Sequence, residues 1–355
     1  MNAQAINTEK LNAFVNRTFN DISSAYGGVM ISIGHKLGLY RAMAGAGPLS
    51  TRELAQRSAC AERYVREWLN SQAAAFYVDY HSHSDTYELT AEQALVLADE
   101  TSPLFIPNAW QAAASLWFDE EKTLTAFRTG KGVAWGEHDS RLHCGSAAFY
   151  RNGYKANLIS QWLPALDGVI EKLNKGIRVA DIGCGHGHSS ILMAQSFPTS
   201  QFFGFDTHVP SLEHAITHAK NADVENRITF EHARATEYPQ HQYDLICFFD
   251  CLHDMGDPVA AARYAAQSLA PDGSVMLVEP FAEDNLEKNL SPISRIYYTA
   301  SSCICCAHSI SEGGQWVLGA QAGEKRLAEV FRKAGFSYFR RVAQTPFNLV
   351  FEARV

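Results

Sequence analysis

The sequence predicts an α/β protein with a Rossmann-like sheet in residues 166–355, preceded by a smaller and mainly helical domain. Within residues 166–355, short β-rich runs alternate with helical runs, which is typical of a parallel sheet with helices on both faces. The first of these runs leads directly into a glycine-rich turn, "DIGCGHG". Residues 1–100 have the order helix, helix, helix and a two-stranded wing, which is the winged-helix order. A chain of 355 residues also favours two domains over one.

The first 100 residues contain the predicted winged-helix-like domain. Apolar residues recur at helical spacing over residues 8–30, and "ISIGHKLGLYRAM" is interpreted as a separate helix with a glycine near its end. Two short helices follow, with Ser50 or Thr51 as N-cap and Glu53 in the first turn. The stretch "FYVDYHSHSDTYELT" completes the pattern as a wing. The apolar positions of the first helix, which motivate a homodimer formed through this domain, are Leu11, Phe14, Val15, Phe19 and Ile22.

Charge argues against nucleic acid as the partner of this domain. The whole chain has a formal net charge of -8. Residues 35–100 contain six Lys or Arg and nine Asp or Glu, a local net of -3. A surface that reads DNA needs clustered cations, and the candidate recognition helix instead pairs Arg63 and Arg66 with Glu62 and Glu67. We therefore expect a module for dimerisation or for covering a substrate.

Residues 101–165 are rich in aromatic side chains and are predicted to be mostly helical. We interpret this segment as a connector whose side chains line a substrate pocket. His138 and His143 lie in it and are interpreted as ordinary loop and helix-end residues.

Residues 166–355 form the predicted catalytic domain. Its last two strands lie close together around "TPFN", which suits an antiparallel pair at the sheet edge. The predicted strands are 177–182, 201–206, 227–231, 243–249, 274–279, 337–343 and 348–354.

The ends of the first two of these strands predict a nucleotide-like ligand. Asp181 stands at the first strand tip, and Gly183, Gly185 and Gly187 follow it; glycines there let the backbone approach a ligand closely. The spacing differs from the G-x-G-x-x-G of dinucleotide sites, and an acid before the turn would repel a pyrophosphate but suits an amino group. Asp206, at the second strand tip, can accept hydrogen bonds from ribose hydroxyls. A ribose, a cationic group and no diphosphate together point to S-adenosylmethionine.

Four stretches, "VADIGCGHG", "GFDTH", "YDLICFFDCLHDMGDP" and "SVMLVEPF", resemble the class I S-adenosylmethionine-dependent methyltransferases. The whole chain is similar to bacterial small-molecule methyltransferases with an N-terminal winged-helix domain, and "LHDMGDP" and "GAQAGEKRLAEV" are typical of that group. The resemblance implies a seven-stranded sheet with an antiparallel last strand and S-adenosylmethionine at the strand tips.

The same resemblance assigns the predicted cofactor contacts. The glycine turn with its acid would hold the methionine end, and Asp206 the ribose. Arg234 departs from the family pattern, which often has Asp there, so adenine recognition is expected to rest on the backbone of residues 233–235 and on Phe249. The cofactor-binding set implied is Asp181, Gly183, Gly185, Gly187, Asp206, Ala233, Arg234, Ala235, Phe249 and Asp250.

The stretch "FFDCLHDMGDP" supplies the candidate catalytic residues. It resembles the His-Asp stretch of plant phenol O-methyltransferases, which makes His253 the expected general base and Glu279 the carboxylate that orients it, as in a catalytic triad. Asp250 follows the same strand, beside the expected methyl donor. An imidazole near its reference pKa of about 6.5 can take a proton from a phenol at neutral pH. Asp257 is interpreted as an N-cap with Pro258 in the first helical turn, and Glu324 as a second flanking acid.

Other interpretations stay open at this point. Because the sulfonium is already a strong methyl donor, N-, S- or C-methylation driven by proximity is an alternative. A non-catalytic S-adenosylmethionine-binding regulator and a nicotinamide-dependent oxidoreductase are the alternatives of other classes. We expect no bound metal, and we interpret Cys303, Cys305 and Cys306 as small residues of a buried segment. The absence of a signal-peptide pattern and of a long apolar run favours a cytoplasmic protein without a membrane segment.

Overall fold

The computed structural model describes residues 6–355, which separate into two compact units. The first consists of residues up to 114 together with 144–152, and the second of 115–143 together with 153–355. The segment predicted as a connector, 101–165, therefore contributes helices to both units.

The first unit begins with one long helix, α1 (Thr8–Lys36). The prediction of a separate helix starting near residue 31 is wrong, because α1 runs on through its glycines. A side chain at Gly28 would place its Cβ 2.3 Å from the Trp110 ring, and one at Gly34 would place it 2.5 Å from the Trp68 ring. The glycines thus serve close packing and do not end the helix.

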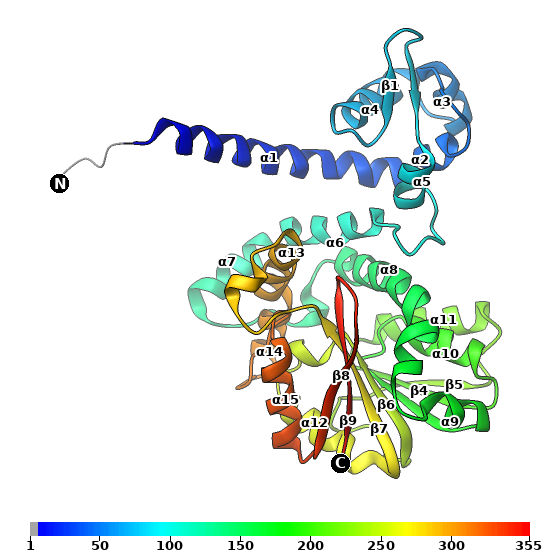
Figure 1. Ribbon diagram of the computed structural model, residues 1–355, viewed down its shortest axis with the longest axis vertical. Coiled ribbons are helices and arrows are strands. Elements are labelled where there is room, and N and C mark those ends of the chain that lie inside the picture. The colour runs from blue at the N-terminus through cyan, green and yellow to red at the C-terminus, as the bar shows by residue number, and fades with distance from the viewer. Residues whose placement is uncertain (1–5) are drawn as a thin grey trace. The chain divides into compact units, whose positions relative to one another are not determined.

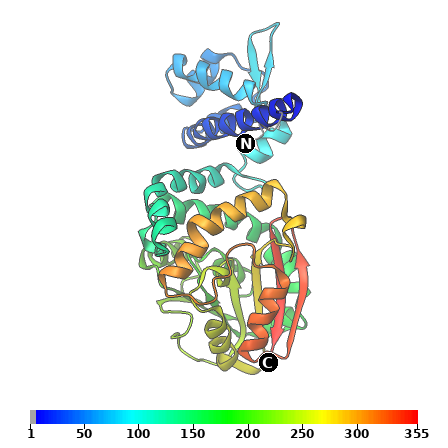
Figure 2. The same ribbon diagram turned by 90° about the vertical axis from the view of Figure 1, so that its left-hand side faces the viewer.

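The rest of the first unit confirms the helix–helix–helix–wing order (Figures 1 and 2). The Ser50 hydroxyl accepts from the Glu53 N–H, and the Glu53 carboxylate accepts from the Ser50 N–H, so the predicted N-cap is a full capping box. The hairpin of the wing is antiparallel and stands out from the helices of this unit in both views. The elements are α2 (Leu39–Met43), α3 (Thr51–Ser58), α4 (Glu62–Ala74), β1 (Asp79–His81), β2 (Thr86–Glu88), α5 (Ala91–Leu97) and α6 (Pro107–Phe118).

Two surfaces of this unit bear on its partners. On α4, Arg66 pairs with Glu62 at 3.4 Å and Arg63 pairs with Glu67, so the helix surface carries both charges, as predicted. On α1, a row of apolar side chains is exposed to solvent. This row, which we call the α1 stripe, consists of Leu11, Phe14, Val15, Phe19, Ile22, Tyr26, Val29 and Ile33.

The second unit contains a seven-stranded sheet in the order β5-β4-β3-β6-β7-β9-β8, which confirms the predicted fold class. Strands β3 to β7 are parallel neighbours, whereas β9 runs antiparallel to both β7 and β8. The last strand is thus inserted between β7 and the edge strand. The bounds are β3 (Arg178–Ile182), β4 (Gln201–Asp206), β5 (Ile228–His232), β6 (Tyr243–Phe249), β7 (Leu269–Pro280), β8 (Tyr338–Gln344) and β9 (Asn348–Arg354).

These bounds match the predicted strands within a residue at most ends, except that β7 begins five residues earlier than 274. Strands β6 and β9 are buried along nearly their whole length, as expected for runs of apolar residues covered on both faces.

Helices flank the sheet on both faces (Figure 1). Helices α12 and α15 pack against each other beside β7 to β9, and α10 and α11 lie beside β4 and β5. The helices of this unit are α7 (Glu120–Thr129), η1 (Trp135–Glu137), α8 (Ser140–Asn157), η2 (Leu158–Trp162), η3 (Leu163–Ala165), α9 (Val169–Lys175), α10 (His188–Ser196), α11 (Val209–Asn221), η4 (Leu252–Asp254), α12 (Pro258–Ser268), η5 (Leu286–Asn289), α13 (Pro292–Ala300), η6 (Ser301–Cys305), α14 (Cys306–Ser311) and α15 (Gly323–Ala334), of which α8 is shared with the first unit.

No helix between residues 6 and 355 combines the length and apolar character that a bilayer crossing requires.

Candidate active site

A glycine turn connects β3 to α10. Gly183, Gly185 and Gly187 have φ values of 71°, 53° and 73°, a region that glycine adopts without steric cost. A Cβ on Gly187 would lie 2.6 Å from the Phe230 ring, so that glycine is required by packing as well. A Cβ on Gly185 would meet no atom of the described chain within 4 Å. The backbone is therefore bare and open at Gly185, which leaves room for a ligand.

Asp181 is buried at the tip of β3 behind this turn. One carboxylate oxygen accepts from the hydroxyls of Ser189 and Ser190, each at 2.6 Å. The other, Oδ1, is buried and has no hydrogen-bond partner among the residues that the structure describes. Burial raises the pKa of Asp181 to about 6, although the two serine hydroxyls lower it. A buried carboxylate with a spare acceptor suits a cationic or N–H donor group of a ligand.

Asp206, at the tip of β4, ties the second strand to the same turn. Its oxygens accept from the backbone N–H groups of Gly185 and His208, both at 2.8 Å. Burial raises its pKa, while these N–H donors act in the opposite direction. Each carboxylate oxygen can accept two hydrogen bonds, so Asp206 retains capacity for a hydroxyl donor.

The residues predicted around the adenine lie near the ends of β5 and β6. The Ala233 N–H donates to the Asp206 carbonyl at 3.2 Å, which brings this segment to the tip of β4. The Arg234 side chain is exposed to solvent, whereas Ala233 and Ala235 are half-buried and pack against the core. Phe249 is buried at the tip of β6 with its ring 5.4 Å from that of Tyr154.

Asp250 follows Phe249 in the left-handed backbone region, with φ 51°. Its two carboxylate oxygens accept from the Tyr154 hydroxyl at 3.0 Å and from the Asn348 amide at 2.7 Å. Burial, and then the charge of Glu279, raise the pKa of Asp250 to about 8. A non-glycine residue in this conformation costs energy, and the contacts on both sides of the carboxylate hold it there.

His253 and Glu279 form a buried pair at the tips of the adjacent strands β6 and β7. The His253 Nδ1 lies 2.7 Å from Glu279 Oε2, and both side chains are almost inaccessible to solvent. Burial opposes the charged form of His253, but the charge of Glu279 and the neighbouring Cys305 outweigh it and raise the pKa of His253 well above its ordinary value. The second ring nitrogen is the one that Glu279 does not hold.

A third side chain next to this pair comes from a distant segment. Cys305, at the end of the π-helical turn η6, is buried and its thiol hydrogen-bonds with the His253 side chain. Burial raises the pKa of Cys305, and His253 counteracts that rise. Cys305 is therefore buried as predicted, whereas Cys303 and Cys306 are only partly buried. The segment also supplies one neighbour of His253, and π-helical turns are frequent at functional sites.

Two further acids named from the sequence, Asp257 and Glu324, each have a contact in the structure. Asp257 accepts from the Ala260 N–H at 2.8 Å and caps α12, as predicted. Glu324 pairs with Arg341 at 3.2 Å, and its place as a second acid flanking His253 stays a prediction.

Sequence reasoning missed Tyr154 and Asn348, the partners of Asp250. They lie 96 and 98 residues from it, and no local pattern links either of them to Asp250. The two histidines of the connector each have a partner within the protein. His138 contacts the Asp119 carboxylate at 3.1 Å, and His143 contacts the Trp135 carbonyl at 3.0 Å.

The fold joins these groups into one region. Strand β3 pairs in parallel with both β4 and β6, so the glycine turn, Asp206 and Asp250 follow neighbouring strand tips, where open α/β sheets bind ligands. The Cys251 thiol donates to the Ile182 carbonyl at 3.0 Å and joins the stretch containing His253 to the glycine turn. A seven-stranded sheet with this strand order and these tips defines the methyltransferase class.

Comparison with protein families agrees with this class. Residues 173–335 match the family model described as a methyltransferase domain, and residues 25–99 match the Rv2258c-like winged HTH domain. The chain therefore combines an N-terminal winged helix-turn-helix domain with a methyltransferase domain.

Curated relatives match part of the chain. The 27-O-demethylrifamycin SV methyltransferase of Amycolatopsis mediterranei (strain S699) is 36% identical over 107 residues, 30% of this chain and 39% of the relative. The alignment thus spans about two fifths of that relative's length.

Solved structures match over nearly the whole chain. Human N-acetylserotonin methyltransferase, in complex with S-adenosylmethionine, is 16% identical, with a TM-score of 0.70 and coverage of 100% of this chain and 99% of that one. An O-methyltransferase family protein from Burkholderia thailandensis is 15% identical, with a TM-score of 0.68 and 99% coverage of both chains. At these identities the similarity shows a shared fold.

Proposed function

We propose that this chain transfers a methyl group from S-adenosylmethionine to a hydroxyl group of a small molecule, with His253 as the general base. The observation that carries the proposal is the buried His253–Glu279 pair, 2.7 Å apart, at a strand tip next to the glycine turn. One relative named above is a 27-O-demethylrifamycin SV methyltransferase, and the Burkholderia thailandensis protein is described as belonging to an O-methyltransferase family. These names support oxygen as the acceptor atom.

The residues at the tips of β3 and β4 fit the proposed cofactor. Asp181 Oδ1 is buried with no partner among the described residues and can accept from the amino group of the methionine part. The open space over Gly185 leaves room beside the turn, and Asp206 can accept from ribose hydroxyls. The human protein of the same fold was solved in complex with S-adenosylmethionine. When bound, S-adenosylmethionine supplies a methyl group activated by its sulfonium charge.

At the adenine end, the fit is looser. Phe249 is apolar and buried at the strand tip, and the backbone of Ala233 to Ala235 is close to Asp206. Arg234 contributes at most its backbone, because a guanidinium cannot accept the adenine amino proton.

His253 would take the proton of the acceptor hydroxyl. Its Nδ1 side is held by Glu279, which fixes the ring and stabilises the imidazolium formed by the transfer. The raised pKa of His253 makes the imidazole a stronger base but favours its protonated form in the resting site. A cationic cofactor bound nearby would disfavour a second positive charge and would bring the pKa of His253 back toward neutrality.

Asp250 would place its carboxyl group beside the methyl donor, where Tyr154 and Asn348 hold it. Its pKa of about 8 means that it is largely protonated at neutral pH in the absence of a cation. A sulfonium close by would favour the carboxylate, so Asp250 is suited to compensate the charge of the cofactor.

We further propose a homodimer formed through the α1 stripe, in a reducing cytoplasm. The large apolar side chains exposed on one helix form a continuous surface of the kind that marks protein–protein contacts. A second copy is the proposed occupant because an exposed apolar helix face is self-complementary in a two-fold pair. The cysteines, all of which lie within residues 6–355, are free thiols, which suits a reducing compartment.

One observation favours a second candidate, N- or S-methylation driven by proximity. The pKa of His253 is raised and its side chain contacts the Cys305 thiol, and both make the ring less available to take a proton from an acceptor, whereas an amine or thiolate acceptor needs no base.

The test is methyl transfer from labelled S-adenosylmethionine to a panel of phenols, alcohols, thiols and amines, with wild type beside His253→Ala. Phenol methylation that collapses in the variant supports the proposal. Amine or thiol methylation that survives the substitution supports the second candidate. Binding of the cofactor without transfer to any member of the panel contradicts both and favours a regulator.

A further inference from the structure

Three histidines in and beside the glycine turn form a cluster that the proposed reaction does not use. His186 lies inside the turn between Gly185 and Gly187, His188 is the first residue of α10, and His218 lies on α11. One ligand nitrogen of each lies within 4.8 Å of the others. Within residues 6–355 this is the only group of three or more His, Cys, Asp or Glu side chains with such a spacing.

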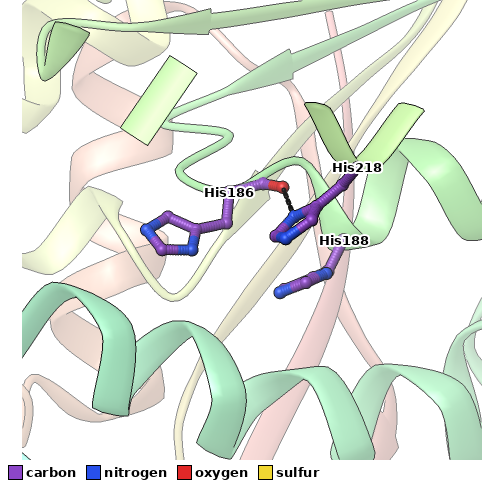
Figure 3. A group of neighbouring side chains, drawn as sticks. All are labelled: His186, His188 and His218. Carbon is purple, nitrogen blue, oxygen red and sulfur yellow. Dashed lines mark hydrogen bonds between the residues drawn. The ribbon is translucent and has the colours of Figure 1, made fainter. Parts of the chain in front are cut away.

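The fold brings the cluster together through the glycines. Gly185 and Gly187 have positive φ values, so the turn reverses sharply and directs two histidines, separated by one residue, toward α11. Figure 3 shows the rings of His188 and His218 side by side and the ring of His186 farther off; the His186 centroid lies 6.2 Å from that of His188 and 6.0 Å from that of His218. His186 is buried, whereas His188 and His218 are half-exposed, which leaves a route for an ion from solvent.

One hydrogen bond already orients a ring for metal binding. His218 Nδ1 lies 3.2 Å from the His186 carbonyl oxygen, drawn as the dashed line in Figure 3. Because a carbonyl only accepts, Nδ1 carries the proton and Nε2 carries the lone pair. A backbone carbonyl on the second nitrogen is the usual outer contact of a metal-binding histidine.

The separations are close to those of a zinc site. Three nitrogens at 2.0–2.1 Å from a tetrahedral ion lie about 3.3 Å from one another, so the ligand atoms must approach by roughly 1.5 Å. The rings of His188 and His218 are stacked, with an angle of 20° between their planes, and they must turn until each plane contains the ion. Both side chains are only half-buried, so neither ring is enclosed on all sides by the core.

We propose that His186, His188 and His218 bind a divalent first-row transition metal ion, Zn²⁺ in the first instance, with at least one coordination position left to water. The site would hold the turn that carries Gly185 and Gly187 against α11. It does not depend on the proposed methyl transfer, because its ligands and its test are separate from the strand-tip residues.

The test is equilibrium dialysis of the full chain against Zn²⁺, with the metal content measured for wild type and for His188→Gln/His218→Gln. The matched control is His83→Gln, an exposed histidine of the wing. We expect one ion per chain, bound by wild type and control alike. Affinity should fall by more than about 100-fold in the double variant, beyond the 10–100-fold typical of losing an outer contact.

Cobalt distinguishes this site from the free thiols. Co²⁺ bound by three imidazoles gives visible absorption without the near-ultraviolet charge-transfer band of thiolate ligands. Saturable binding with a thiolate band, binding that survives the double substitution, or no saturable binding at all would overturn the proposal. Far-ultraviolet circular dichroism shows whether the double variant and the His83→Gln control have folded. If the double variant does not fold, His188→Gln alone replaces it, and its affinity for Zn²⁺ should also be lower than that of wild type.

Discussion

The two units depart from the ordinary burial pattern in opposite directions. The first exposes a row of large apolar side chains on α1, with Phe14 and Phe19 each 67% accessible. The second buries acids and a histidine at its strand tips, with His253 3% and Glu279 2% accessible. Globular proteins rarely do either without a reason, since both cost stability. The exposed apolar row on α1 indicates a protein–protein contact. The buried ionisable residues at the strand tips indicate a ligand-binding site.

The largest effect is expected when the buried His253 at the strand tips is replaced. His253→Gln should lower kcat for hydroxyl methylation by about 10²- to 10⁴-fold, the range for loss of a general base. Cofactor binding, measured by calorimetry with S-adenosylhomocysteine, should change little. The control is His83→Gln, and a rate within about twofold of wild type for His253→Gln would remove the base role, given that range.

The second largest effect is expected for self-association through the exposed α1 stripe. Phe14→Glu/Phe19→Glu should weaken self-association by at least about 100-fold, because each phenylalanine contributes roughly 1.5–3 kcal/mol when buried. Sedimentation velocity across a concentration series measures this. Ala13→Glu/Asn20→Glu adds the same charge on the opposite, solvent-exposed face of α1 and should leave the association intact. A monomeric wild type at micromolar concentration contradicts the dimer.

Glu279→Gln sharpens the comparison through pH. In wild type, the base form of His253 appears only as pH rises through its raised pKa, so hydroxyl methylation should increase from neutral to alkaline pH. Removing the carboxylate charge lowers the pKa of His253, so the rising limb should move to lower pH. The rate of hydroxyl methylation at high pH, where it no longer changes with pH, should fall by roughly 10–100-fold in the variant. This is less than the full loss expected when the general base itself is removed. An unchanged pH profile would mean that Glu279 does not set the pKa of His253.

The smallest effect concerns stability. The pKa of Asp250 is about 8 in the folded chain, against about 3.9 when unfolded. The folded state therefore binds more protons between these values, and its stability falls as pH rises through that window. Asp250→Asn removes this loss, so the variant should gain stability relative to wild type as pH rises from 5 to 8. Urea unfolding at both pH values measures this difference, with the exposed Asp272→Asn as control. An Asp250→Asn variant whose stability relative to wild type is the same at both pH values would contradict the prediction.

Most of the fold could be predicted because its signals are local. The runs that became β3, β4, β6 and β9 are continuous and apolar, and the capping box at Ser50 and Glu53 marks a helix start within four residues. The end of α1 could not be predicted, since the glycines near it are explained only by rings of Trp68 and Trp110. Long-range packing of this kind leaves no pattern in the neighbouring sequence.

The same limit applies to the site. Asp181, Asp206, His253 and Glu279 stand directly at strand ends, where position alone predicts that they meet. Tyr154, Asn348 and Cys305 reach Asp250 and His253 from distant segments, so that only the folded chain identifies them. The His218 partner of the glycine turn was missed for that reason too, because a lone histidine on a helix carries no signal.

The order of the strands has a consequence for synthesis. Strand β9 follows β8 along the chain but lies between β7 and β8, so β8 has no place in the sheet until β9 has left the ribosome. Asn348, the first residue of β9, is also the residue that holds one oxygen of Asp250. A nascent chain stalled before residue 348 would therefore carry an open sheet edge and a loosely held Asp250. Closure of the sheet and the contact of Asn348 with Asp250 therefore depend on the same strand.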